Sequence, residues 1–251
     1  MMAQAHLPRS RRTALNDQGE PILLTSFFWR RRRPVTIPWF EVRGAISIRG
    51  IGAITATNLH SVAGYIFSRT TSTVDLPNLK SVGGDLDLRA TLKLYVPALT
   101  EVGGSLMVSE PNLPCLETIG KRLWGYWGGC LRLPNLRHVG GSFEVEGAAS
   151  VFLPVLQWVG FDLKVSYLTT VFSAPRLEAV GATLAASSAK VIHAAKLESV
   201  GDALYTESAM NYYQPDFDGS LHWEMHPDAR ARWQMRERVR QALKALPPIE
   251  I

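Results

Sequence analysis

The sequence predicts a mainly β protein that coils into a parallel β-solenoid of about nine turns, closed by a capping α-helix at its C-terminal end. A short phrase, clearest as Val-Gly-Gly-Asp-Leu-Asp-Leu at residues 82–88, recurs about every twenty residues. A fixed period of this size is typical of solenoids, in which each turn stacks on its neighbours and cannot bury its apolar face alone. The phrase opens at Val42, Val62, Val82, Val102, Ile119, Val139, Val159, Val180 and Val200, with spacings of 20, 20, 20, 17, 20, 20, 21 and 20 residues.

Within each turn, apolar residues recur at fixed positions counted from this Val or Ile, which we call position 0. They occupy positions −3, 0, +4, +6 and about +12 and +14, with glycine at +1 or +2. The alternation of +4 and +6 has the period of a strand, so we expect one short strand there in every turn. Leu92, Leu94 and Val96 predict a second strand in some turns, and glycine at +1 allows a backbone bend that a Cβ would oppose. A second corner is marked by prolines, at Pro77, Pro97, Pro134 and Pro154.

The segments before the repeats predict an arm and a cap. Residues 1–21 are polar, contain Pro8 and Gly19 and show no period, so we expect a flexible basic arm. Residues 22–41 are apolar and aromatic. We expect them to form an N-terminal cap, because the open strand edges of a first turn invite aggregation.

The repeats fill residues 42–213, and residues 214–251 predict a linker followed by a capping helix. Good helix formers run through 227–246, with a proline in the first turn and two prolines after the last residue. Trp233, Val239 and Leu243 fall on one face of this helix, which we expect to pack on the last turn.

The pattern Pro-x-Leu-x-x-Val-Gly-Gly-x-Leu-x-Leu resembles the leucine-rich-repeat superfamily, and most closely its receptor L-domain type. It is also similar to the twenty-residue repeats of uncharacterised bacterial and phage proteins. The resemblance spans Val42 to Tyr213 and implies a right-handed coil that binds other macromolecules. The chain departs from ordinary leucine-rich repeats because it lacks their buried Asn after the strand. No functional residue transfers, since the matching positions are all structural.

The net charge of +5 is concentrated near the N-terminus. Residues 1–40 contain seven arginines against Asp17 and Glu20, and the remaining residues balance. The apolar segment 22–29 is short and precedes its arginines, which is the wrong order for a signal peptide. No apolar run has the length of a membrane span. We therefore expect a cytoplasmic protein, with delivery into another cell left open.

The two cysteines, Cys115 and Cys130, provide neither a disulfide framework nor the spacing of metal ligands. We expect free thiols that are mostly buried.

The outward positions +5 and +7 carry the first candidate binding residues. At +7 the sequence places Arg49, Arg69 and Arg89 in successive turns, which predicts arginines stacked at the spacing of neighbouring strands, about 4.8 Å. Such a ladder would bind an acidic partner. The alternative is that Asp85 and Asp87 neutralise it as a solvated face.

Aromatic and sulfur-containing side chains share this face. Phe67 and Met107 lie at +5, and Trp124 and Tyr126 lie in the irregular turn after the 17-residue spacing. Exposed aromatics beside arginines have the composition of a protein-binding hot spot. The alternative is that Trp124 and Trp127 fold over the shortened turn and fill it. A further column at +13 is either an outward aromatic stack or a core row, at Phe152, Phe172, His193 and Tyr213.

The arginine run could contact a polyanion such as nucleic acid, or an anionic surface. The alternative is a plain solvated basic arm. The run comprises Arg30, Arg31, Arg32 and Arg33.

A metal site at His222 and His226 is disfavoured, because Pro227 opposes a helix through both. Glu144 and Glu146 could act as an acid and base pair only beside a groove, and no catalytic constellation has its required context. We expect no cofactor and no metal.

These observations predict a non-enzymatic repeat scaffold whose partner is another protein. The alternatives are a polyanion tether acting through the arginine-rich arm, and a carbohydrate-active enzyme with a β-helix fold. The oligomeric state stays open.

Overall fold

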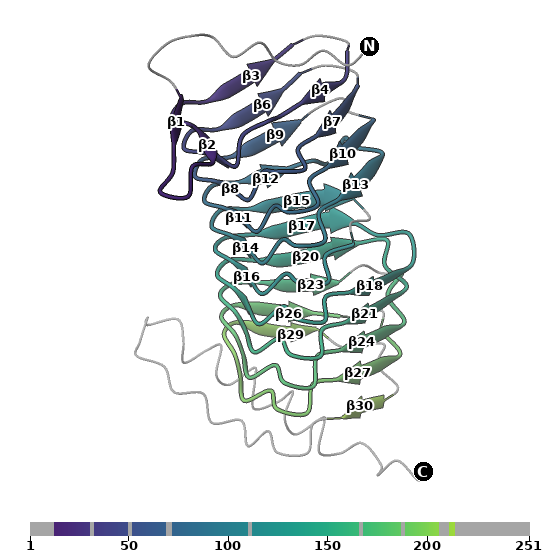
Figure 1. Cartoon of the computed structure of the whole chain (residues 1–251). Helices are drawn as coiled ribbons and strands as arrows, with labels where there is room; N and C mark the ends of the chain where they lie inside the picture. The colour runs from purple at the N-terminus through teal and green to yellow at the C-terminus, as the bar shows by residue number, and fades with distance from the viewer. Residues whose placement is uncertain are drawn as a thin grey trace.

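The computed structural model describes residues 13–30, 33–49, 52–68, 72–109, 112–165, 168–186 and 189–205, and the backbone of 211–213. All regular structure in these ranges is β, and the chain winds into a parallel β-solenoid (Figure 1). Each turn passes through three faces before the next turn stacks on it. The predicted fold class is therefore confirmed for the repeats, while the expected helix at 227–246, with Trp233, Val239 and Leu243, lies outside the described residues.

The first face is an eleven-stranded sheet, in which the nine strands of the predicted repeats have two residues each, at positions −1 and 0. Its strands are parallel except for the antiparallel β1–β2 pair, and Val82 lies beside Val62 and Val102 in register. Sequence analysis did not anticipate this sheet. In order across the sheet, the strands are β1 (Thr13–Leu15), β2 (Pro21–Leu23), β5 (Glu41–Val42), β8 (Ser61–Val62), β11 (Ser81–Val82), β14 (Glu101–Val102), β16 (Thr118–Ile119), β19 (His138–Val139), β22 (Trp158–Val159), β25 (Ala179–Val180) and β28 (Ser199–Val200).

The second face is a ten-stranded parallel sheet, and it confirms the strand predicted at +4 and +6. Leu86 lies in register with Ile66 and Leu106, so residues one period apart are direct neighbours. The strands are β3 (Phe27–Trp29), β6 (Ile46–Ile48), β9 (Ile66–Ser68), β12 (Leu86–Asp87), β15 (Leu106–Ser109), β17 (Leu123–Tyr126), β20 (Phe143–Glu146), β23 (Leu163–Val165), β26 (Thr183–Ala185) and β29 (Ala203–Tyr205).

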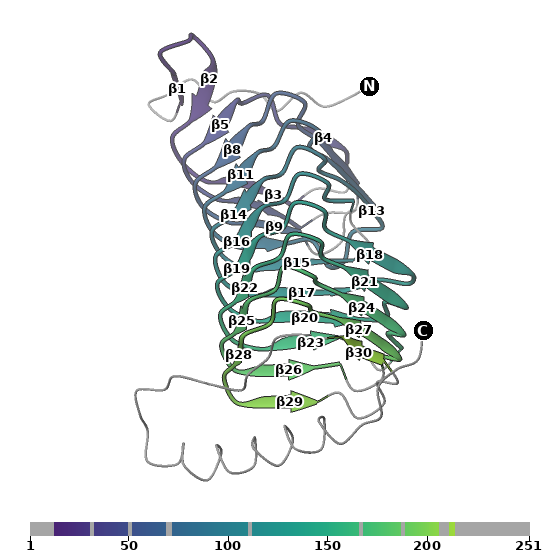
Figure 2. The same ribbon diagram turned by 90° about the horizontal axis from the view of Figure 1, so that it is seen from below.

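The third face contains two separate sheets, one after the other along the solenoid (Figures 1 and 2). The break coincides with the 17-residue spacing, where the turn contributes one isolated bridge, Asn112 beside Tyr95, in place of a strand. The four-stranded sheet contains β4 (Val35–Thr36), β7 (Ala53–Thr55), β10 (Thr73–Asp75) and β13 (Lys93–Tyr95). The five-stranded sheet contains β18 (Cys130–Arg132), β21 (Ser150–Phe152), β24 (Val171–Ser173), β27 (Val191–His193) and β30 (Asn211–Tyr213).

One continuous apolar core runs along the inside of the coil. The positions predicted to point inward are buried, as Leu79, Val82, Leu86 and Val96 illustrate. Leu92, which was predicted to lie in the second strand, instead precedes it and is 85% exposed. Each buried aliphatic side chain contributes about 1.5–3 kcal/mol against neighbouring turns, so the contacts between turns hold the solenoid together.

The glycines at +1 form a column at the corner between the first two faces. A Cβ added to Gly140 would overlap the carbonyl oxygen of Gly120 in the preceding turn, and Gly160 meets Gly140 in the same way. Close approach of successive turns, rather than an unusual bend, is therefore what excludes a side chain here.

The solenoid begins one turn earlier than predicted. Leu23 pairs with Val42, and β2, β3 and β4 contribute a strand to each face, so residues 22–41 form a turn rather than a separate cap. Part of the arm expected to be flexible is also ordered, because β1 pairs with β2 and covers the edge of the eleven-stranded sheet. Asn16 closes this hairpin, accepting hydrogen bonds at Oδ1 from the backbone N–H groups of Gln18 and Glu20.

Candidate binding face

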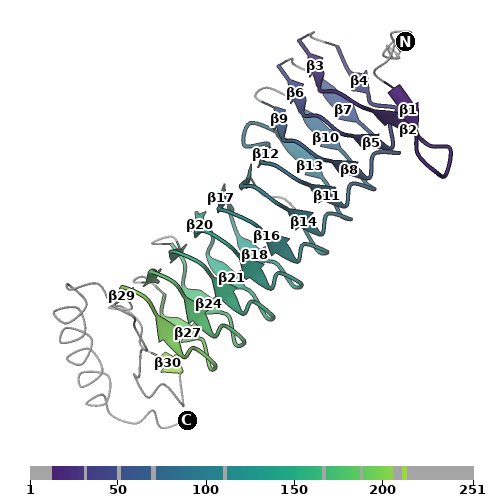
Figure 3. The ribbon, with the colours of Figure 1, turned by 90° about the vertical axis from the view of Figure 1, so that its left-hand side faces the viewer.

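A row of side chains at +5 follows the outer surface of the ten-stranded sheet, whose strands stack along one side of the coil in Figure 3. We call it the outer row. Register pairing makes each member a direct neighbour of the next, and four of the six are large and apolar. At about 4.8 Å between strands, the row is roughly 24 Å long. Its members are Phe28, Ser47, Phe67, Asp87, Met107 and Trp124.

Exposure varies along the outer row. Phe28 is 63% exposed, whereas Phe67, Met107 and Trp124 are half-buried. The two short members between them are covered: Ser47 lies between Phe28 and Phe67, and Asp87 between Phe67 and Met107, so that Asp87 is only 8% exposed. The apolar members therefore define the surface that a partner would meet.

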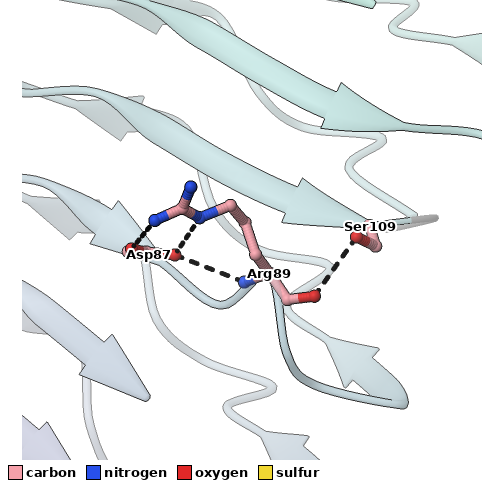
Figure 4. A network of polar contacts seen from close by, with 3 residues as sticks. All are labelled: Asp87, Arg89 and Ser109. Carbon is pink, nitrogen blue, oxygen red and sulfur yellow. Dashed lines mark hydrogen bonds and ion pairs between the residues drawn. The ribbon is translucent and has the colours of Figure 1, made fainter. Parts of the chain in front are cut away.

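Arg89 neutralises the buried carboxylate. Its Nε donates to Oδ1 of Asp87 at 2.9 Å, and its Nη2 donates to Oδ2 at 2.8 Å (Figure 4). The hydroxyl of Ser109 donates to the carbonyl of Arg89 at 3.3 Å, which ties the next strand to this residue. The hydrogen bond to Asp87 raises the pKa of Arg89 above its usual value. Such two-point pairs fix orientation as well as charge.

The guanidinium of Arg89 also lies over the ring of Trp124, 5.4 Å from its centroid. Arg89 thus contacts both Asp87 and Trp124. For this arginine, the structure agrees with the alternative in which an aspartate neutralises the predicted ladder. Arg49 is exposed at the end of β6, and Arg69 lies outside the described residues. Asp85 has another role, since its Oδ1 accepts the backbone N–H of Ser105 at 2.7 Å.

The shortened turn separates the roles of its two tryptophans. Trp127 is 4% exposed and lies in the core, beside the space that a side chain at Gly125 would occupy. Trp124 instead points outward as part of the outer row, and Tyr126 is about half exposed at the end of the same strand. The filling role therefore belongs to Trp127 alone, and Trp124 stays available as a binding residue.

Beyond Trp124, the face becomes charged and internally paired. Arg122 forms an ion pair with Glu144, and Nζ of Lys164 lies 2.6 Å from Oδ2 of Asp162. The hydrogen bond from Lys164 lowers the pKa of Asp162, and the same bond raises the pKa of Lys164. The neighbouring Glu146 is exposed.

The +13 column is not one row. Phe172 is fully buried and pairs with Val151, as the core-row alternative expects, while Phe152 pairs with Ser173 and lies in a different row. The thiols are also less buried than expected: Cys130 is exposed and Cys115 is intermediate.

Of the arginine run, Arg30 and Arg33 are described and exposed, while Arg31 and Arg32 lie outside the described residues, as do His222 and His226. In the part of the chain that the structure describes, no cluster of three or more His, Cys, Asp or Glu is placed to hold a metal ion. The same residues include no helix long and apolar enough to cross a membrane.

Sequence reasoning missed two groups of exposed aromatic side chains. Phe28 belongs to the outer row, and starting the repeat at Leu23 would have placed it at +5. Trp158 and Phe161 are exposed near the glycine corner, on the opposite side of the repeat from the third face. The sequence around them shows no strand pattern, because the strand there, Trp158–Val159, has only two residues.

No protein-family model, curated protein or solved structure matches this chain.

Proposed function

We propose that this protein is a non-enzymatic scaffold that binds another protein through the outer row of its ten-stranded sheet. The observation that carries the proposal is the outer row, in which the exposed or half-buried Phe28, Phe67, Met107 and Trp124 alternate with short covered residues until Met107 and Trp124 meet on adjacent strands. Arg89, held by Asp87, lies over the Trp124 ring at the end of this row. The resemblance of the repeats to leucine-rich repeats supports the same class of function as an analogy.

The composition and size of the row favour a protein over a small ligand. Aromatic residues, Met and Arg are enriched at the centres of protein interfaces, and a few such residues carry most of the binding energy. A row roughly 24 Å long fits within the patch of about 800 Å² that each partner contributes to a standard interface. The paired charges beyond Trp124 would form the polar rim.

The test compares capture of partners by the intact chain and by a Phe67→Asp/Trp124→Asp variant, followed by mass spectrometry. The matched control is Trp158→Asp/Phe161→Asp, which places two carboxylates at exposed aromatics away from the outer row. The proposal expects a partner that the intact chain and the control retain and the outer-row variant loses. Equal loss in both variants, with all three chains folded by circular dichroism, would contradict it.

A polyanion tether is a second candidate, because Arg30 and Arg49 are exposed at the ends of the adjacent strands β3 and β6. No ion pair involving either arginine is found among the described residues. Binding of a twenty-nucleotide single-stranded DNA at low salt tests it. The tether predicts salt-sensitive binding that Arg30→Gln/Arg49→Gln weakens, and absence of binding by the intact chain would exclude this function.

A further inference from the structure

The break in the third face leaves a strand edge in the middle of the solenoid. β18 is the first strand of the five-stranded sheet and has β21 as its neighbour on one side only. On the other side, the preceding turn contributes Asn112, which is bridged to Tyr95 rather than to β18. In the ranges that the structure describes, no backbone hydrogen bond joins residues 112–114 to 130–133.

The bonding pattern of the intact turns shows which groups face this edge. The N–H of Lys93 donates to Ser72 and the carbonyl of Tyr95 accepts from Leu76, so positions +11 and +13 bond to the preceding turn. Backbone groups in a parallel strand alternate between its two neighbours. In β18 the corresponding residues are Cys130 and Arg132, whose N–H and C=O groups point to the open edge. The N–H of Leu133, by contrast, donates to Phe152 in the next turn.

We propose that the open edge of β18 binds an extended, acidic segment of a partner protein, which adds to the five-stranded sheet as an extra parallel strand. Main-chain hydrogen bonds give such strand addition its affinity, and side chains at alternate positions give its specificity. The site is separate from the outer row and does not depend on the function proposed for it.

Charge identifies the chemistry of the segment. Arg132 is exposed on β18 with its guanidinium held over the ring of Phe152, 5.0 Å from the centroid. No carboxylate within the described residues forms an ion pair with it, and the exposed Lys93 is the other cation on the facing edge strand β13. A carboxylate at the position beside Arg132 would complete a charge-assisted pair.

The protein's own sequence supplies a probe with this chemistry. The heptapeptide Thr-Ser-Thr-Val-Asp-Leu-Pro repeats residues 71–77, which include β10, and Asp75 occupies there the same +13 position as Arg132 occupies in β18. A peptide that pairs with β18 as neighbouring turns pair with each other would place its aspartate beside Arg132. The same peptide with Lys in place of Asp is the matched control.

Hydrogen exchange followed by NMR tests the edge residue by residue. In the free protein the amides of Cys130 and Arg132 should exchange quickly, while those of Leu131 and Leu133 exchange slowly. The aspartate peptide should protect Cys130 and Arg132, and the lysine peptide should bind about tenfold more weakly. Arg132→Glu should reverse this preference, whereas Arg137→Glu, an equal charge change at an exposed residue outside the third face, should leave it intact.

Slow exchange at Cys130 and Arg132 in the free protein would show a covered edge and overturn the proposal. Failure of the aspartate peptide to protect them, or equal binding of both peptides, would also overturn it. Protection that grows with protein concentration in the absence of peptide would assign the edge to a second copy of this chain instead.

Discussion

Arg89 lies with its guanidinium 5.4 Å from the centre of the Trp124 ring, although Arg89 follows β12 and Trp124 belongs to β17, two turns further along the solenoid. Asp87 holds the guanidinium in this place, and Met107 lies in the intervening strand. One ion pair thus holds a cation against an aromatic side chain at the end of an apolar row, and this geometry supports the binding role proposed for the row.

Removing the guanidinium should destabilise the protein more than removing an exposed cation. Arg89→Met leaves the buried carboxylate of Asp87 unpaired, which should lower the free energy of unfolding by about 1–3 kcal/mol. Arg43→Met breaks the exposed pair with Glu41 and should change it by at most about 1 kcal/mol. Urea denaturation measures both changes in the free energy of unfolding. Equal changes would show that Arg89 does not stabilise the buried carboxylate of Asp87.

The glycine column should tolerate no side chain. Gly140→Ala brings a Cβ against the backbone of Gly120, and such overpacking should cost about 1–3 kcal/mol or more. Gly129→Ala is the matched control, because a Cβ there meets nothing within 4 Å. It should be neutral or stabilising, by up to about 1 kcal/mol. Similar melting temperatures for the two variants would refute close approach as the role of the column.

Trp127 should be the most costly truncation in the irregular turn. Trp127→Ala removes a buried ring beside Gly125 and should cost about 3–5 kcal/mol. Trp127→Phe should cost less, because the indole N–H has no hydrogen-bond partner among the described residues and its loss leaves none unpaired. Trp124→Ala, on the outer face, should affect stability less than Trp127→Ala. If urea denaturation showed a larger loss of stability for Trp124→Ala than for Trp127→Ala, the assignment of Trp127 to the core and Trp124 to the outer face would be wrong.

The Lys164–Asp162 pair predicts an effect at acidic pH. Its hydrogen bond lowers the pKa of Asp162 in the folded protein below the unfolded value of about 3.9. The stabilisation is therefore present above about pH 4 and is lost as the pH falls through the lower folded pKa. Lys164→Gln should raise the pKa of Asp162 toward the ordinary value, as an NMR titration of the carboxyl carbon would show. An unchanged pKa would mean that Lys164 is not its cause.

The ten-stranded sheet was predictable from sequence because its strands are long enough to show alternation. In β20, Phe143 and Val145 point inward with Glu144 between them, and this alternation recurs in most turns. The eleven-stranded sheet was not predictable, since strands such as Ser81–Val82 have only two residues and two residues show no period. The first turn was not recognised in the sequence, because Leu24 and Thr25 occupy positions +1 and +2, where later turns carry glycine.

The candidate binding face was predictable in its residue types and only partly in its contacts. Asp87 ends β12 and Arg89 follows two residues later, so their pairing could be foreseen as an alternative. The contact of Arg89 with Trp124 could not, because it joins position +7 of one turn to position +5 two turns later and so depends on a side-chain conformation that the repeat pattern does not give. The sequence also left open whether Phe172 faces outward or inward, and the 21-residue spacing aligns it with the buried Val151.

Hydroxyl-radical footprinting of the complex with a captured partner tests the proposed binding face most directly, because it reports on the side chains of Phe, Met, Trp and Tyr. Oxidation of Phe67, Met107 and Trp124 should fall when the partner binds, while Trp158 and Phe161 should be oxidised at the same rate in the free and bound states. Protection of Trp158 and Phe161 with unchanged oxidation of Met107 and Trp124 would contradict the assignment and place the binding site at the glycine corner.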